Sequence, residues 1–309
     1  MAGKKMSMNL TESIKDEKMI KHLYLDLTIN ELIEKMNLIN LIPCEKDDLV
    51  PFFAKVRGYM SAVDQFGENW LIKEISAEEV HLHKVQEIAY YVDVLLKTLA
   101  APTIVSTING KTYRATKIIE HAMQAGSYNY LEEPLKKMLA NDLINRWLFF
   151  DEDRNPNNYL IFHDSDNTYF PIVIDYNKAD LEIQTMKISG DPNKFGWLRE
   201  EKTRFLTLLK PENFESMHIE DFEERLQCLM SITEKDLIEL CKKIFTMESI
   251  DDVESTSTIV TNNIISRAKY LNYYFRKWFK KIDKKEEKEI DDRYSGLGKS
   301  FMDYYKDES

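Results

Sequence analysis

The sequence has little cysteine and no long apolar run. Among 309 residues there are three cysteines, Cys44, Cys228 and Cys241, and none stands in a Cys-x-x-Cys spacing. This argues against a disulfide framework or a zinc site and favours a reducing compartment. The chain also lacks the roughly 18 consecutive uncharged apolar residues of a membrane-spanning helix. Its first residues, MAGKKMSMNLTESIKDEKM, carry charges throughout and have no apolar core of a signal peptide. We therefore expect a cytoplasmic protein with no membrane partner.

The chain also has no excess of positively charged residues. The formal net charge is −11 at pH 7, which argues against a surface that binds nucleic acid, although a local basic pocket is left open. Hydrophobic residues make up 43% and charged residues 31% of the chain, a composition typical of a folded globular protein. The length suits one two-lobed body or two domains.

The first 122 residues predict a small lobe rich in strands. Residues 49–75 place β-branched and aromatic side chains around a turn signal at Gly67, which indicates two strands. A helix is expected over INELIEKMNLI (29–39), and a second begins at Ser76, which forms a capping box with Glu79. Asn109-Gly110 then predicts a β-hairpin, because both residues tolerate positive φ.

The second part of the sequence predicts a helical lobe with one hairpin. Residues 129–149 are expected to form a long helix, which leads into an acidic, asparagine-rich loop. Strands at 159–163 and 169–175 follow, joined by a polar turn. Residues 181–309 are mostly helical by pattern, most clearly in IVTNNIISRAKYLNYYFRKWFKK (259–281).

The loop in LINRWLFFDEDRNPNNYLIF (143–162) presents the chemistry of a candidate site. Asn158 and Asp175 offer hard oxygen ligands of the kind that Mg²⁺ takes when it also holds nucleotide phosphates. Asp153 is then placed to orient an attacking hydroxyl or to accept its proton. Lys73, in the predicted strand WLIKEI, needs a partner if it is buried, and Glu87 on the following helix could supply one.

These residues resemble the protein-kinase-like fold. Asp153-Arg154-x-x-x-Asn158 followed by Ile174-Asp175-Tyr176 looks like its catalytic loop and metal-binding aspartate. The Asp-Arg pair and the preceding ANDLINRWLFF are most similar to the HipA-like and phosphoinositide 3/4-kinase-like branch. The resemblance implies an α+β fold of two lobes. Residues 1–121 would form an N-terminal appendage with a small antiparallel-sheet lobe, and residues 122–309 a mostly helical lobe.

The resemblance also implies roles for individual residues. Asp153 and Lys73 would be catalytic, and Asn158 and Asp175 would bind Mg²⁺. The residues expected to bind ATP are Lys73 with its partner Glu87, Gly58 and Ser61 in a phosphate-covering loop at 56–62, and Glu120 at a hinge near 120–122. The sequence departs from the usual pattern in having one glycine, Gly58, in that loop, and Tyr176-Asn177 in place of Phe-Gly.

The function expected from this resemblance is transfer of the γ-phosphate of ATP to a hydroxyl, as in a HipA-like serine/threonine protein kinase. A protein substrate is expected, and an antitoxin-like or regulatory partner is left open. The alternatives are a small-molecule kinase of the aminoglycoside or choline type, a lipid kinase, and a kinase-fold binding module without catalysis; transfer of a whole nucleotide by the same fold is left open as well. Against the aminoglycoside type, Asp151 stands where those enzymes usually carry a histidine.

Overall fold

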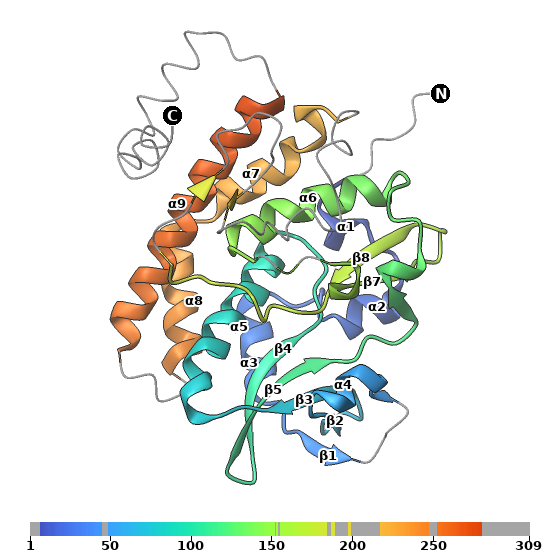
Figure 1. Cartoon of the computed structure of the whole chain (residues 1–309), viewed down its shortest axis with the longest axis vertical. Helices are drawn as coiled ribbons and strands as arrows, with labels where there is room; N and C mark the ends of the chain where they lie inside the picture. The colour runs from blue at the N-terminus through green and yellow to red at the C-terminus, as the bar shows by residue number, and fades with distance from the viewer. Residues whose placement is uncertain are drawn as a thin grey trace.

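The chain folds into a sheet-rich lobe followed by a helical lobe, which confirms the predicted α+β class (Figure 1). This is a computed structural model that describes residues 7–44, 49–151, 153, 155–183, 187–188, 197–198, 217–246 and 252–279. Arg154, which belongs to the predicted catalytic loop, lies outside the described residues, as do Glu152 and the charged segment 280–292.

The small lobe is built on a five-stranded antiparallel sheet. The strands follow the spatial order β1-β2-β3-β5-β4 and comprise β1 (Ile42–Cys44), β2 (Tyr59–Val63), β3 (Asn69–Glu74), β4 (Thr103–Ile108) and β5 (Lys111–Lys117). The predicted turns are confirmed: Asn109 and Gly110 have φ of 50° and 79°, and Gly67 has φ of 85°. Positive φ at both central residues is what a tight hairpin turn needs.

One buried helix lies between the sheet and the helical lobe. The predicted capping box is confirmed, since Ser76 N donates to Glu79 Oε2 at 2.8 Å, and α5 (Val80–Leu95) follows a short 3₁₀ turn (Ala77–Glu79). The helix contacts β4 on one side and α8 on another. Every residue from Lys84 to Asp93 is buried, as expected of a helix with protein on all sides.

The large lobe combines a small sheet with four longer helices. Its sheet follows the order β6-β7-β8, and the elements are β6 (Ala122–Gln124), α6 (Leu135–Leu148), β7 (Tyr159–His163), β8 (Tyr169–Val173), β9 (Lys187–Ile188), β10 (Trp197–Leu198), α7 (Glu223–Ser231), α8 (Glu234–Thr246) and α9 (Val253–Phe279). The predicted hairpin is thereby confirmed. The helix predicted from residue 129 begins only at Leu135, because Pro134 occupies the position before its first turn. None of the helices in the described ranges has both the length and the apolar character that crossing a membrane requires.

Two expectations for residues 49–62 are wrong. A short helix, α4 (Phe52–Val56), replaces the start of the predicted strand, and residues 59–62 belong to β2 rather than to a loop. Pro51 precedes the helix and its carbonyl accepts from Lys55 N at 3.0 Å, whereas Gly58, at φ of 81°, ends the turn that follows. Helix-start and helix-end residues therefore override the strand preference of the side chains between them.

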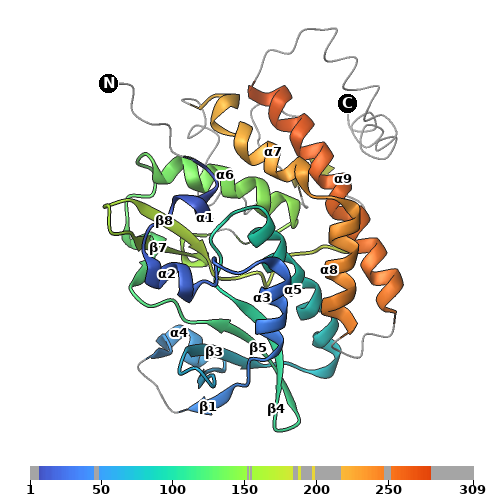
Figure 2. The ribbon, with the colours of Figure 1, turned by 180° about the vertical axis from the view of Figure 1, so that it is seen from behind.

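The N-terminal segment carries three short helices. They are α1 (Leu10–Ser13), α2 (Glu17–His22) and α3 (Ile29–Asn37), the last of which confirms the helix predicted at 29–39. Figure 2 shows α1 and α2 beside the β7–β8 hairpin, and α3 beside α5.

This segment bonds to several parts of the body. Met8 N donates to Glu224 Oε2 at 2.6 Å, and Lys15 N donates to Asp164 Oδ2 at 2.8 Å. His22 Nε2 lies 3.0 Å from the carbonyl oxygen of Ile118, in the connection between the lobes. The N-terminal segment is thus bonded to the helical lobe, to its hairpin and to the inter-lobe connection.

The packing of α8 can be tested through its cysteine. Cys241 is fully buried in this helix, and burial raises the pKa of its thiol to about 12. At pH 8 such a thiol is only about 10⁻⁴ thiolate, so we expect it to resist a thiol reagent until the protein is unfolded. Cys44 and Cys228 are half-buried and should react in the native state, with Cys228 the slower of the two because burial raises the pKa of its thiol. Mass spectrometry after timed labelling checks this, and native labelling of Cys241 as fast as that of Cys44 would contradict the packing.

Candidate functional site

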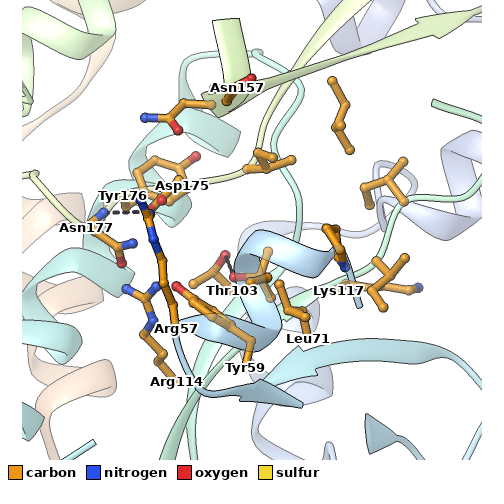
Figure 3. Close-up of a pocket in the computed structure, with 18 of the residues that line it drawn as sticks. Arg57, Tyr59, Leu71, Thr103, Arg114, Lys117, Asn157, Asp175, Tyr176 and Asn177 are labelled. Carbon is orange, nitrogen blue, oxygen red and sulfur yellow. Dashed lines mark hydrogen bonds between the residues drawn. The ribbon is translucent and has the colours of Figure 1, made fainter. Parts of the chain in front are cut away.

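A cavity of about 920 Å³ lies between the two lobes. Its walls come from the segment 49–57, the sheet of the small lobe, the start of α5, the connection at 118–121 with the adjoining β6, the loop at 153–158 and the segment 174–177. Figure 3 shows side chains from both lobes facing this space. Of the predicted site residues, Asp153, Asn158 and Asp175 all line it.

Hydrogen bonds within the loop hold Asp153 in place. Its backbone N donates to the buried carboxylate of Asp151 at 3.1 Å, and its own Oδ1 accepts from Asn155 Nδ2 at 2.9 Å. Asn158 donates from its side chain to the carbonyl oxygen of Asp153. The asparagines therefore serve first to shape the loop, because their side chains satisfy backbone groups in a segment without regular structure.

Asp175 follows the second strand of the hairpin and is joined to the same loop. Ile174 N donates to the carbonyl oxygen of Asn158 at 3.3 Å, which holds the two segments side by side. Asp175 Oδ1 accepts from the backbone N of Asn177 at 2.9 Å. This bond fixes the carboxylate at the end of β8, where it lines the cavity.

The oxygen donors suit a magnesium ion that arrives with a nucleotide. In the described part of the chain, no three carboxylate, thiolate or imidazole groups lie close enough to hold a metal by themselves. Mg²⁺ commonly takes one or two carboxylates and completes its shell with water and substrate phosphates. Asp175 and Asn158, on one wall of the cavity, are such a donor set.

The expected pairing of Lys73 with Glu87 is not formed. Glu87 Oε2 lies 3.0 Å from Lys84 Nζ, one turn earlier on the same helix, and accepts from Val105 N at 3.0 Å. Lys73 Nζ instead lies 5.6 Å from the ring centroid of Tyr59. A buried carboxylate takes the nearest donors, and Lys84 is itself buried beside it.

Lys73 and Asp175 are nevertheless both close enough to His83 for their charges to affect its pKa. Burial lowers the pKa of His83, which lines the cavity; its bond to Gln86 and the charge of Asp175 oppose this, whereas the charge of Lys73 adds to it. His83 is thus within electrostatic reach of Lys73 and Asp175, one from each lobe.

The other residues expected at the cofactor, Ser61, Gly58 and Glu120, are not among those that line the cavity. The Ser61 hydroxyl is buried and donates to the carbonyl oxygen of Cys44 at 2.7 Å, toward the outer strand β1. The N–H of Gly58 donates to the Lys55 carbonyl at 2.9 Å, so it is already bonded. Glu120 is exposed and accepts from Asn69 at 3.4 Å, whereas its neighbours Ile118 and Ile119 line the cavity.

A buried polar network lies directly behind the site. Arg146 pairs with Asp93, and its Nε lies 3.2 Å from Asp142 Oδ2. Burial by itself lowers the pKa of Arg146, but Asp142 and Asp93 outweigh it and the net shift is upward. The network reaches the site through two tyrosines, because Tyr176 donates to Asp93 at 2.6 Å and Tyr159 donates to Asp142. These tyrosines adjoin Asp175 and Asn158 in the chain, so the network links both donors to α5 and α6.

Sequence reasoning missed two arginines that line the cavity. Arg57 stands between α4 and β2, and Arg114 lies in β5 opposite Lys73. The alternation in β5 could have indicated Arg114, because the neighbouring Tyr113 and Ala115 are the apolar residues that face the core.

Solved structures similar to this chain include a kinase, a protein of a toxin–antitoxin system and a pseudokinase domain. The proinflammatory kinase CtkA of Helicobacter pylori shares 12% identity, with 71% of this chain and 91% of that chain covered and a TM-score of 0.48. HipA of Shewanella oneidensis MR-1, solved with HipB and operator DNA, shares 10% identity over 97% and 87% of the chains, with a TM-score of 0.29. The pseudokinase domain of BIR2, an immune regulator of the RLK/Pelle family, shares 13% identity over 78% and 81%, with a TM-score of 0.26. No family model matches the sequence, and no curated protein matches it either.

The fold of this chain is protein-kinase-like, as predicted. Its own elements carry this description: an antiparallel sheet backed by one buried helix, a connection at 118–121, a helical lobe, and a loop and hairpin that face the sheet across a cavity.

Proposed function

We propose that this protein is an ATP- and Mg²⁺-dependent phosphotransferase that acts on the hydroxyl of a protein serine or threonine, in the manner of a HipA-like kinase. The observation that carries the proposal is the meeting of Asp153, Asn158 and Asp175 on one wall of the inter-lobe cavity. Phosphoryl transfer needs positioning and charge neutralisation more than covalent chemistry, and these groups are suited to both tasks.

In this proposal each residue has one role. Asp153, oriented by Asn155, accepts the proton of the attacking hydroxyl or orients that hydroxyl. Asn158 and Asp175 hold Mg²⁺, which, when bound, neutralises charge on the phosphates. The bond from Ile174 N to the Asn158 carbonyl keeps the two ligands in register. The aliphatic lining, which includes Leu71, Ile104 and Leu160, suits an apolar ring system and excludes water from it.

A second candidate is a kinase-fold module that binds a nucleotide without transferring phosphate. The observation that favours it is the pairing of Glu87 with Lys84, which leaves Lys73 without the carboxylate partner that the resemblance gives it. The two candidates differ in turnover and not in binding.

Titration with ATP and Mg²⁺ tests the proposal. A ligand at about a hundred times its dissociation constant stabilises the native state by about 2.7 kcal/mol, and we expect the Tm to rise by several degrees. Incubation with γ-labelled ATP and a protein mixture should then label a protein acceptor. A stabilised protein that transfers no phosphate would support the binding module. If ATP and Mg²⁺ do not stabilise the protein and no phosphate is transferred, both candidates are wrong.

A further inference from the structure

The small-lobe wall of the cavity carries positive charge from two separate elements. Arg57 follows α4 directly, two residues before β2, and Arg114 lies in the middle of β5. Both line the cavity, and Figure 3 shows their side chains directed toward the segment that holds Asp175 and Asn177. Two guanidinium groups therefore face the proposed metal ligands across the cavity.

The sheet fixes the direction of Arg114. Side chains alternate along a strand, and Tyr113 and Ala115 are 6% and 1% exposed on the core side of β5. Arg114 and Thr116 consequently face the cavity, next to Leu71 of β3 and Val105 of β4. The guanidinium carbon of Arg114 lies 5.0 Å from the ring centroid of Tyr59, which supports its planar face.

Arg114 is a partly buried cation that, among the described residues, feels the charge of Asp175 but forms no direct ion pair. Burial lowers the pKa of its guanidinium and the charge of Asp175 opposes this shift, yet the group stays charged at any ordinary pH. Within the described residues, no hydrogen bond or ion pair engages its side chain, and its guanidinium lies against the Tyr59 ring. An anion that binds next to a cation removed from water offsets the cost of that cation's desolvation, so this position favours an anionic ligand.

Lys73 is less suited to that task. Its ammonium lies 5.6 Å from the same Tyr59 ring, but Lys73 does not line the cavity, whereas its strand neighbour Arg114 does. A guanidinium also binds two phosphate oxygens at once through parallel N–H groups, which an ammonium cannot do.

We propose that Arg114, assisted by Arg57, binds the phosphates of the nucleoside triphosphate, in the place that the kinase resemblance gives to Lys73. This inference rests on the proposed function, because it takes the ligand of the cavity to be a nucleotide. A cavity of about 920 Å³ is large enough for one. The phosphates then lie between the two arginines of the small lobe and the donors Asn158 and Asp175 of the large lobe.

Calorimetric titration of four variants with MgATP and with adenosine tests the assignment. Arg114→Met removes the charge and keeps the length of the side chain, so MgATP affinity should fall about 10- to 100-fold. Adenosine affinity should change less than about twofold, because adenosine has no phosphate. Arg57→Met should weaken MgATP by a smaller factor, since Arg57 is exposed. Lys73→Met should weaken it less than Arg114→Met. Lys111→Met is the matched control, because Lys111 lies in the same strand but is exposed and paired with Glu74.

The outcomes separate the inference from the proposed function. If Lys73→Met abolishes MgATP binding while Arg114→Met and Arg57→Met bind as the wild type does, the inference is wrong and the function stands. If the wild type binds no MgATP, both the inference about Arg114 and the proposed function are wrong. Retained adenosine binding shows that a variant is folded. Should Arg114→Met fail that check, Arg114→Lys preserves the charge without the paired donors and is expected to lose MgATP affinity by a smaller factor.

Discussion

Asp153→Asn is expected to lower phosphate transfer by about 10²- to 10⁴-fold while MgATP still binds, because positioned proton transfer contributes factors of that size. The substitution keeps the shape of the side chain and the Oδ1 atom that accepts from Asn155 at 2.9 Å. It removes only the negative charge and the basicity. Initial rates with γ-labelled ATP, together with the dissociation constant of MgATP, provide the measurement.

The matched control for this variant is Asp166→Asn. Asp166 is an exposed residue of the β7–β8 turn and pairs with Lys15 rather than facing the cavity. Its loss should leave the transfer rate within about twofold of the wild type, since surface pairs contribute little. Unchanged transfer in Asp153→Asn would remove Asp153 from the proposed chemistry. Loss of MgATP binding in that variant would instead mean that Asp153 belongs to the metal site.

Arg146→Met is expected to lower the free energy of unfolding by about 3–5 kcal/mol, because it leaves the buried carboxylates of Asp93 and Asp142 without their cation. Urea unfolding followed by circular dichroism measures this loss. MgATP binding should weaken too, since Tyr176 and Tyr159 connect these carboxylates to the residues beside Asp175 and Asn158.

Two comparisons make the result specific. Lys111→Met breaks an exposed pair with Glu74 and should cost less than about 1 kcal/mol. Adding Asp93→Asn to Arg146→Met removes one of the stranded charges, so the double variant should regain part of the loss. A loss below about 1 kcal/mol for Arg146→Met alone would show that the network does not stabilise the fold as described.

The elements that the sequence predicts well are those with local determinants. The Ser76–Glu79 capping box and the Asn109-Gly110 turn depend on neighbours within a few residues, and both form as expected. The loop residues Asp153 and Asn158 meet Asp175 because a short hairpin returns the chain to its starting point. Sequence spacing was enough to indicate that meeting.

The sequence could not decide which of several possible partners a side chain contacts. Glu87 had a lysine available on β3 and another one helical turn away, and only packing selects Lys84. Ser61 looked like part of a loop, but pairing between β1 and β2 turns its hydroxyl toward Cys44. Arg114 carries no motif, and its place opposite Asp175 depends on the register of three strands.

The N-terminal segment also bears on how the two lobes can move. The His22 ring lies 3.0 Å from the carbonyl oxygen of Ile118 in the inter-lobe connection, and the His22 carbonyl accepts from Nζ of Lys117, the last residue of β5, at 2.8 Å. The same segment is also anchored to α7 of the helical lobe, through the bond from Met8 to Glu224. The N-terminal segment therefore bridges the inter-lobe connection and restricts the movement of one lobe relative to the other. Wide opening of the cleft would require α2 to detach first, whereas small rocking motions would leave it docked.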